Sequence, residues 1–249
     1  MEDSKKESKA KNFIKRYCNN KLAVIGFFTL VLITLIVIIA PPFLPFSEAE
    51  IDPLAFNMPP SAKHLLGGDD VGRDVLSRLL YGGRVSLAVG IFSTAVSVIV
   101  GIPLGMLAAF YRGAFEVVVM RLSDIFMSFP STILILFLVS MFGPSIITVT
   151  VVIGVLGWPK FARQIYGSVL SIREKDYIEG AVAIGAKDKL IITRYILPNA
   201  VAPIFISITF RIASAIILES SLSFLGMGVQ PPAASWGNML YNAQSITIL

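Results

Sequence analysis

Five long apolar runs divide the chain, at about residues 22–44, 85–111, 116–142, 145–165 and 199–225. A helix needs roughly 20 apolar residues to cross the hydrocarbon core of a bilayer, and each run is long enough. The pattern therefore predicts an all-α membrane protein, a polytopic helical bundle with five spanning helices. The first run exceeds the apolar core of a signal peptide and has no small-residue cleavage site before Pro41 and Pro42, so we expect it to be retained.

The composition agrees with a membrane protein. Of 249 residues, 55% are hydrophobic and 15% are charged, which leaves no separate soluble domain. The net charge of +5 is concentrated in the first 21 residues and in the stretch 160–197. Because positive residues beside spanning helices mark the cytosolic side, this distribution indicates a lipid bilayer as the partner and argues against nucleic acid.

Charge and span order together predict the topology. We expect a cytoplasmic basic tail over 1–21, a first transmembrane helix over 22–44, an extracytoplasmic loop over 45–84 and a core domain over 85–249. Within the core, the residues near 112 and the loop 166–198 face the cytosol, and 143–144 and 226–249 face outward. The N-terminus is then cytoplasmic.

The charged loop between the last two apolar runs predicts two short helices. Asp176 opens the first helix, Gly185 ends it, Asp188 leads the second, and Pro198 stops it before the last span. Apolar residues lie between the charges: Val182, Ile184, Leu190 and Ile191. We expect this surface to dock on a soluble partner; the alternative is an amphipathic helix on lipid headgroups.

Two charges fall inside the last apolar run, at Arg211 and Glu219. Charges in a span are costly unless they face protein or water, so each is a candidate for a translocation pathway or for an interhelical pair. In the second run, the Gly101-xxx-Gly105 spacing lets another helix approach closely.

The sequence carries no signature of catalysis or of metal binding. The single histidine, His64, is expected to be a solvated loop residue, and the lone Cys18 has no partner. No nucleophile, base or metal-ligand set appears at helical spacing, which disfavours an intramembrane enzyme. A channel or ion-coupled carrier predicts more buried charges or inverted repeats than we find. The chain lacks a phosphate-binding loop, so any ATP-driven work must use a partner.

The charged loop resembles the cytoplasmic signature of permease subunits of binding-protein-dependent ATP-binding-cassette (ABC) importers. That signature reads Glu-Ala-Ala, three residues, Gly, nine residues, Ile, any residue, Leu-Pro. The stretch carrying it here contains Glu179, Gly180, Ala181, Gly185, Ile196, Leu197 and Pro198. Gly180 replaces an alanine, and Tyr195 occupies the place of the isoleucine.

Two further stretches resemble the dipeptide, oligopeptide and nickel branch of that family. Residues 68–87 include Asp69, Gly72, Arg73 and Asp74, and residues 219–238 begin at Glu219. The first predicts a charge-paired outer entrance to the second helix. The second contains Gly-Met-Gly-Val-Gln-Pro-Pro, which cannot continue a helix and predicts a shaped outer loop.

The resemblance implies the type I ABC importer permease (MetI-like) fold in a bacterial or archaeal plasma (inner) membrane. Its partners would be a second permease subunit in a heterodimer, two ATP-binding subunits that hold ATP and Mg²⁺, and an extracytoplasmic solute-binding protein. This chain would be non-catalytic and bind no cofactor. Di- and oligopeptides are the implied cargo, with nickel or a metal chelate as the alternative. The family has a sixth helix, so we expect the sequence to be short of its last one.

Overall fold

The computed structural model describes residues 17–247, and among them it contains helices and loops but no strand. Most of the basic tail expected over 1–21 lies outside the described residues, as do Ile248 and Leu249. The elements in chain order are α2 (Lys21–Ile39), η1 (Pro41–Phe43), η2 (Pro53–Ala55), α3 (Val75–Tyr111), α4 (Gly113–Ser128), α5 (Ser131–Phe142), α6 (Ile146–Val155), α7 (Trp158–Arg173), α8 (Asp176–Ala183), α9 (Asp188–Leu190), η3 (Ile191–Ile196), α10 (Leu197–Ala200), α11 (Ala202–Phe224) and α12 (Trp236–Thr247).

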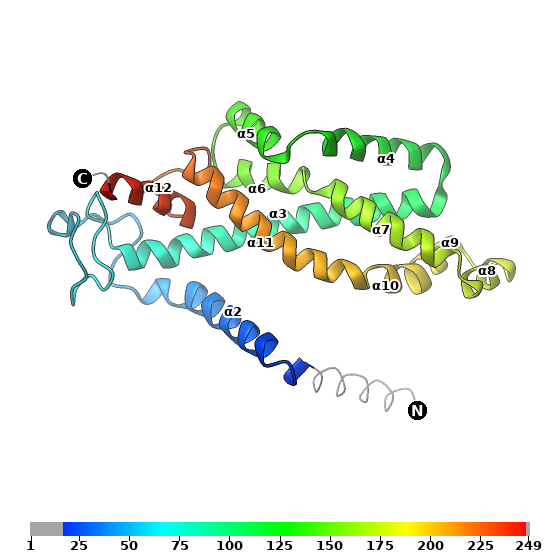
Figure 1. The fold of residues 1–249 in the computed structure, drawn as a ribbon, viewed down its shortest axis with the longest axis horizontal. Helices are drawn as coiled ribbons and strands as arrows, with labels where there is room; N and C mark the ends of the chain where they lie inside the picture. The colour runs from blue at the N-terminus through cyan, green and yellow to red at the C-terminus, as the bar shows by residue number, and fades with distance from the viewer. Residues whose placement is uncertain (1–16, 248–249) are drawn as a thin grey trace.

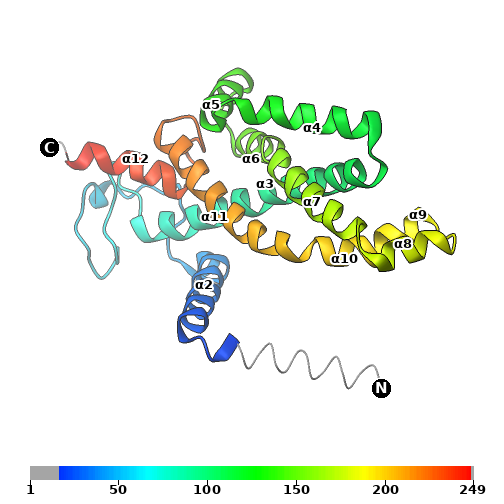
Figure 2. The ribbon, with the colours of Figure 1, turned by 45° about the vertical axis from the view of Figure 1, so that its right-hand side comes forward.

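Helix α3 runs along the long axis of the molecule and packs against both α7 and α11 (Figure 1). The loop 40–74 and α12 lie at one end of this axis, and α8, α9 and α10 lie at the other (Figures 1 and 2). Successive connections therefore alternate between the two ends, as expected for a chain that crosses a bilayer repeatedly.

Four helical segments are long and apolar enough to span a membrane, namely α2, α3, α6 with α7, and α11. The run 116–142, expected to be one helix, is instead α4 and α5, bent by 89°. The bend falls at Phe129, whose backbone is extended, and at Pro130. A residue before proline is pushed out of the helical region, and proline itself donates no hydrogen bond. Counting the bent pair as one span gives the five spans expected.

Helix α3 begins ten residues earlier than the apolar run predicts, at Val75 instead of 85. Asp74 caps it by accepting from the backbone N–H of Ser77 at 2.7 Å. The extension includes Arg84, whose Nε donates to the carbonyl of Val37 at the end of α2. Arg78 and Arg84, which hid this part of the helix, each donate to a backbone carbonyl of another segment, so local hydropathy understates the helix length.

Helix α2 touches the bundle at few points. Of its residues, all of which the structure describes, only Val37 is buried. Val37 lies against Gly83 of α3, where a Cβ would come within 3.0 Å of it. Most other residues of α2 are apolar and exposed, as expected for a helix surrounded by lipid.

The expected close approach at Gly101 and Gly105 is confirmed. A Cβ on Gly101 would lie 2.5 Å from the carbonyl oxygen of Trp158, and one on Gly105 would lie 2.1 Å from that of Ala162. Both oxygens belong to α7, so the two glycines set the distance between α3 and α7.

Replacing Gly105 with alanine is expected to destabilise the bundle by roughly 1–3 kcal/mol, because the new methyl group meets backbone that must shift. Gly167→Ala is the matched control, since Gly167 of α7 has open space around its Cβ position. Thermal unfolding of the detergent-solubilised protein measures the difference. Equal melting temperatures for the two variants would contradict this account of the helix contact.

Candidate functional site

The segment after α7 projects beyond the bundle and contains the two short helices expected there (Figure 1). The first, α8, ends in a Schellman turn: the N–H of Gly185 donates to the carbonyl of Val182, and the N–H of Ala186 donates to that of Ala181. Gly185 has φ +77°, a conformation that glycine adopts easily. The expected end of the first helix at Gly185 is therefore confirmed.

The second helical stretch differs from the expectation. Pro198 does not stop it, because α10 continues through Pro198 to Ala200 and α11 begins at Ala202. The turn before it, Ile191–Ile196, is a π-helix. Proline lacks an N–H and its ring crowds the carbonyl four residues earlier; a wider turn at that point relieves both problems.

Helix α8 has one buried face and one exposed face. Ile178 and Ala181 belong to a core cluster that also contains Phe161 and Ile165 of α7. Val182 and Ile184 are exposed, Ile184 to 85% of its maximum. Leu190 is exposed as expected, but Ile191 is buried and belongs to the core instead of the docking surface.

A cleft of ≈ 650 Å³ separates α8 from the end of α3. Its lining includes the acidic residues Glu179 and Asp188 and the basic residues Arg112 and Arg173. Arg173 donates to the carbonyl of Ala109 at the end of α3 and lies over the ring of Phe110. Helix α8 is therefore packed on α7 through the core cluster, and this arginine joins α7 to α3.

The remaining positions of the cytoplasmic signature are Gly180, Ile196, Leu197 and Pro198. Gly180 lies on the exposed side of α8 with open space around its Cβ position. At the far end, Ile196 is fully buried, Leu197 is half-buried and Pro198 is exposed. Ile196 ties the π-helix into the same core cluster as Ile178.

Arg211 bonds to another helix. Its Nη2 donates to the carbonyl of Ile153 at 2.8 Å. The helix breaks between α6 and α7, and there the N–H of Gly157 donates to the carbonyl of Gly154 and not to that of Ile153. The carbonyl of Ile153 is therefore free to accept from Arg211. A Cβ on Gly157 would lie 2.5 Å from Arg211 Nη2, so this glycine makes room for the guanidinium.

Glu219 is fully buried near the opposite end of α11. Its carboxylate accepts hydrogen bonds from Ser86 of α3 at 2.8 Å and from Ser223 at 2.7 Å. The same hydroxyls accept from the backbone N–H groups of Trp236 and Val229. Glu219 thus joins α3, α11 and the loop before α12. In the described part of the chain, no ion pair links it to Arg211.

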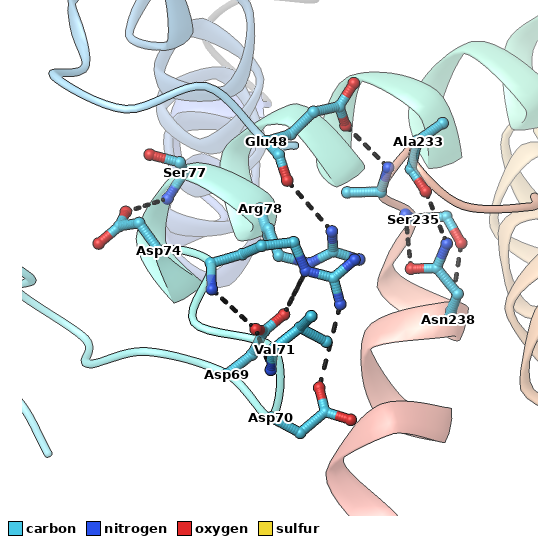
Figure 3. A network of polar contacts seen from close by, with 12 residues as sticks. Glu48, Asp69, Asp70, Val71, Asp74, Ser77, Arg78, Ala233, Ser235 and Asn238 are labelled. Carbon is cyan, nitrogen blue, oxygen red and sulfur yellow. Dashed lines mark hydrogen bonds and ion pairs between the residues drawn. The ribbon is translucent and has the colours of Figure 1, made fainter. Parts of the chain in front are cut away.

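The 68–74 stretch forms a charge-paired entrance to α3, as the sequence predicts (Figure 3). Asp69 accepts from Arg73 Nε at 2.8 Å and from two backbone N–H groups. Gly72 has φ +88°, and a Cβ there would lie 2.4 Å from the carbonyl oxygen of Asp52. Asp74 is the helix cap. All four residues therefore shape the N-terminal end of α3.

Sequence reasoning missed two residues of this cap at the N-terminal end of α3. Arg78 is fully buried; its Nη1 donates to the carbonyl of Glu48, and its Nε lies 3.5 Å from Asp69 (Figure 3). A side-chain oxygen of Glu48 in turn accepts from the N–H of Ala234. The cap therefore ties the first loop to the loop before α12, a pairing of distant segments that no local pattern reveals.

The expectation for His64 is wrong: the residue is buried, not solvated. Its Nδ1 lies 3.0 Å from Asp74, its Nε2 lies 3.4 Å from Asp52, and its ring stacks on Phe46. A hydrogen bond from Lys63 holds the pKa of Asp52 at about 2, so that carboxylate is ionised near neutral pH. The histidine thus helps to fasten the loop to the cap of α3.

An apolar helical bundle with a two-helix segment projecting at one end is the architecture of a multi-pass membrane protein. The chain belongs to the family of binding-protein-dependent transport system inner membrane components, whose model matches residues 101–249. A second model, the N-terminal transmembrane domain of oligopeptide transport permease C, matches residues 8–60.

Several permeases are similar along nearly the whole chain. The glutathione transport system permease protein GsiD of Pectobacterium atrosepticum is 39% identical over 96% of this chain and 80% of its own length. The dipeptide transport system permease protein DppC of Alkalihalophilus pseudofirmus is 38% identical over 92% and 76%. The oligopeptide transport system permease protein OppC of Bacillus subtilis is 33% identical over 92% and 75%. These relatives confirm the branch indicated by the sequence motifs.

A solved structure supports the fold. The MetNI methionine ABC transporter in inward-facing form matches with a TM-score of 0.57 and 22% identity, over 69% of this chain and 82% of the other. The expected MetI-like permease fold is confirmed.

Proposed function

We propose that this chain is one of two permease subunits of an ATP-driven importer of di- and oligopeptides. The observation that carries the proposal is the 33–39% identity to dipeptide, oligopeptide and glutathione permeases over more than nine-tenths of the chain. The chain would line the path with a second permease and receive cargo from an extracytoplasmic solute-binding protein.

The ATP-binding subunits would transmit the energy of ATP hydrolysis to this chain through contacts with α8 and α9. Two ATP-binding subunits, which hold ATP and Mg²⁺, would grip the exposed face around Glu179, Val182 and Ile184. The buried face of α8 packs on α7, so a movement of the ATPase would tilt α7 and, through Arg173, α3. This chain would bind no cofactor and carry out no catalysis itself.

The orientation follows from this coupling. The end of the molecule with α8 and α9 would face the cytosol, and the 40–74 loop and α12 would face outward in a bacterial or archaeal inner membrane. The N-terminus would then be cytosolic. The cap built on Asp69, Arg73 and Arg78 would lie where the solute-binding protein docks.

The test is reconstitution of the chain with its second permease, its ATPase subunits and its binding protein in proteoliposomes. We expect ATP-dependent accumulation of labelled trialanine, abolished when the binding protein is left out. Accumulation of Ni²⁺ instead of trialanine would contradict the proposal that the cargo is a peptide. Accumulation of trialanine without ATP would overturn the class of transporter and favour a carrier.

A further inference from the structure

A cavity lies between α7 and α11, away from the projecting α8, and its mostly apolar lining contains a group of polar and basic side chains. Its volume is ≈ 290 Å³, and its polar lining consists of Lys160, Gln164, Ser207, Arg211 and Ser214. On α7 the residues are four apart, and on α11 they are four and three apart, so each set lies on one face of its helix. Phe210 adds an apolar patch to the lining.

The charge of this cavity is unbalanced. Lys160 lies near the middle of the span Ile146–Arg173, and Arg211 lies near the middle of α11. Of the cavity's lining residues none is acidic, and among the described residues neither cation has a carboxylate within ion-pair distance. Two cations at this depth are costly against lipid, so the face must meet water or an anion.

The guanidinium of Arg211 is held in a fixed direction. One of its nitrogens bonds to the carbonyl of Ile153, and Gly157 provides the space that it occupies. Its Nε is buried without a hydrogen-bond partner in the described part of the chain. A fixed guanidinium with Lys160 nearby is well suited to a carboxylate, which accepts two hydrogen bonds from such a group.

We propose that this cavity binds the C-terminal carboxylate of a peptide in transit. The inference rests on the proposed function and names the group that the path recognises. Arg211 and Lys160 hold the carboxylate, Gln164 and the serines face the polar backbone of the last residue, and Phe210 contacts its side chain. Gln164 Nε2 already donates to the carbonyl of Pro203 and Ser214 Oγ to that of Phe210, so the two cations carry most of the recognition.

The first test uses a cysteine placed in the cavity. Cys18 is the only cysteine of the chain, so Ser214→Cys in a Cys18→Ser background is labelled at one position. With the complex in detergent and no binding protein, we expect trialanine to slow labelling by a negatively charged methanethiosulfonate and trialanine amide to have little effect. Adding Arg211→Gln should abolish the protection.

The second test is uptake. In proteoliposomes we expect Arg211→Gln and Lys160→Gln to raise the KM for trialanine about tenfold, as for loss of a charge-assisted hydrogen bond. Arg211→Lys should recover part of the loss. Arg121→Gln is the control, since Arg121 is an exposed cation of α4 that pairs with Asp124; its KM should not change.

The outcomes separate this inference from the function on which it rests. If the wild-type complex does not accumulate trialanine, the proposed function fails. If it does, but acid and amide protect the introduced cysteine equally or not at all, the carboxylate site is wrong. If the variants lower kcat and the yield of complex at unchanged KM, the two cations pair with an acid of the second permease instead.

Discussion

Valine in place of Gly185 is expected to lower peptide uptake strongly while the protein still inserts and folds. Gly185 has φ +77°, but its Cβ position is open, so the substitution causes backbone strain without a steric clash. A non-glycine residue in this region costs roughly 1–2 kcal/mol, which α8 can relieve by abandoning its Schellman turn. The angle between α8 and α9 would then be lost, and with it the surface that the ATPase grips.

The experiment compares uptake with ATP hydrolysis in proteoliposomes. We expect Gly185→Val to lower uptake about tenfold or more, the equivalent of about 1.4 kcal/mol, while the ATPase loses its response to binding protein and substrate. Gly185→Asn should be milder because asparagine tolerates this conformation, and Gly180→Ala should be active. Glu179→Lys, which reverses charge on the same surface, should act like Gly185→Val. Substrate-stimulated ATPase in Gly185→Val and Glu179→Lys would refute the docking role.

The second large effect is expected at Glu219. Leucine there leaves the hydroxyls of Ser86 and Ser223 without their carboxylate, in a site from which water is excluded. The loss is roughly 3 kcal/mol, two hydrogen bonds to a charged group at about 1.5 kcal/mol each. Because those hydroxyls also hold the N–H groups of Val229 and Trp236, the loop before α12 should loosen at the same time.

Thermal unfolding in detergent and hydrogen exchange over 227–238 measure this effect. Glu219→Gln is the control, because the amide keeps the shape and one acceptor oxygen, and it should retain most of the stability. Ser223→Ala should loosen the loop at Val229 more than at Trp236. If Glu219→Leu melts like the wild type, the carboxylate is not the junction of α3, α11 and the loop before α12.

Local chemistry explains which parts of the fold the sequence could predict. A glycine at the end of a polar helix, as at Gly185, forms its turn with neighbours in the chain, so the turn is visible in the sequence. The same holds for Gly101 and Gly105, whose spacing defines a flat helix face.

The errors arose where distant segments satisfy a polar group. His64 is buried only because Phe46, Asp52 and Asp74 come together around it. Arg84 fits inside α3 because the end of α2 offers it free carbonyls. The bend at Pro130 had a local signal, a proline after Phe129, but the average hydropathy of the 116–142 run concealed it.

The candidate site also contains residues that the sequence could predict and residues that it could not. Glu179, Gly185 and the other signature positions could be found from their motif, and Arg211 from its depth in an apolar run. The cavity around Arg211 could not, because Lys160 and Gln164 come from α7, and their approach to α11 depends on the break at Gly157. Only the packing of the helices shows that the two cations share a surface.

Helix α2 has an evolutionary consequence. Val37 is its one buried residue, so natural selection should constrain little in this helix beyond its apolar character and its length. Exchanges among leucine, isoleucine, valine and phenylalanine along its exposed faces should be close to neutral. Sequence drift should therefore run fastest here, with Val37 and its contact at Gly83 changing only together, whereas α3 and α7 should diverge slowly.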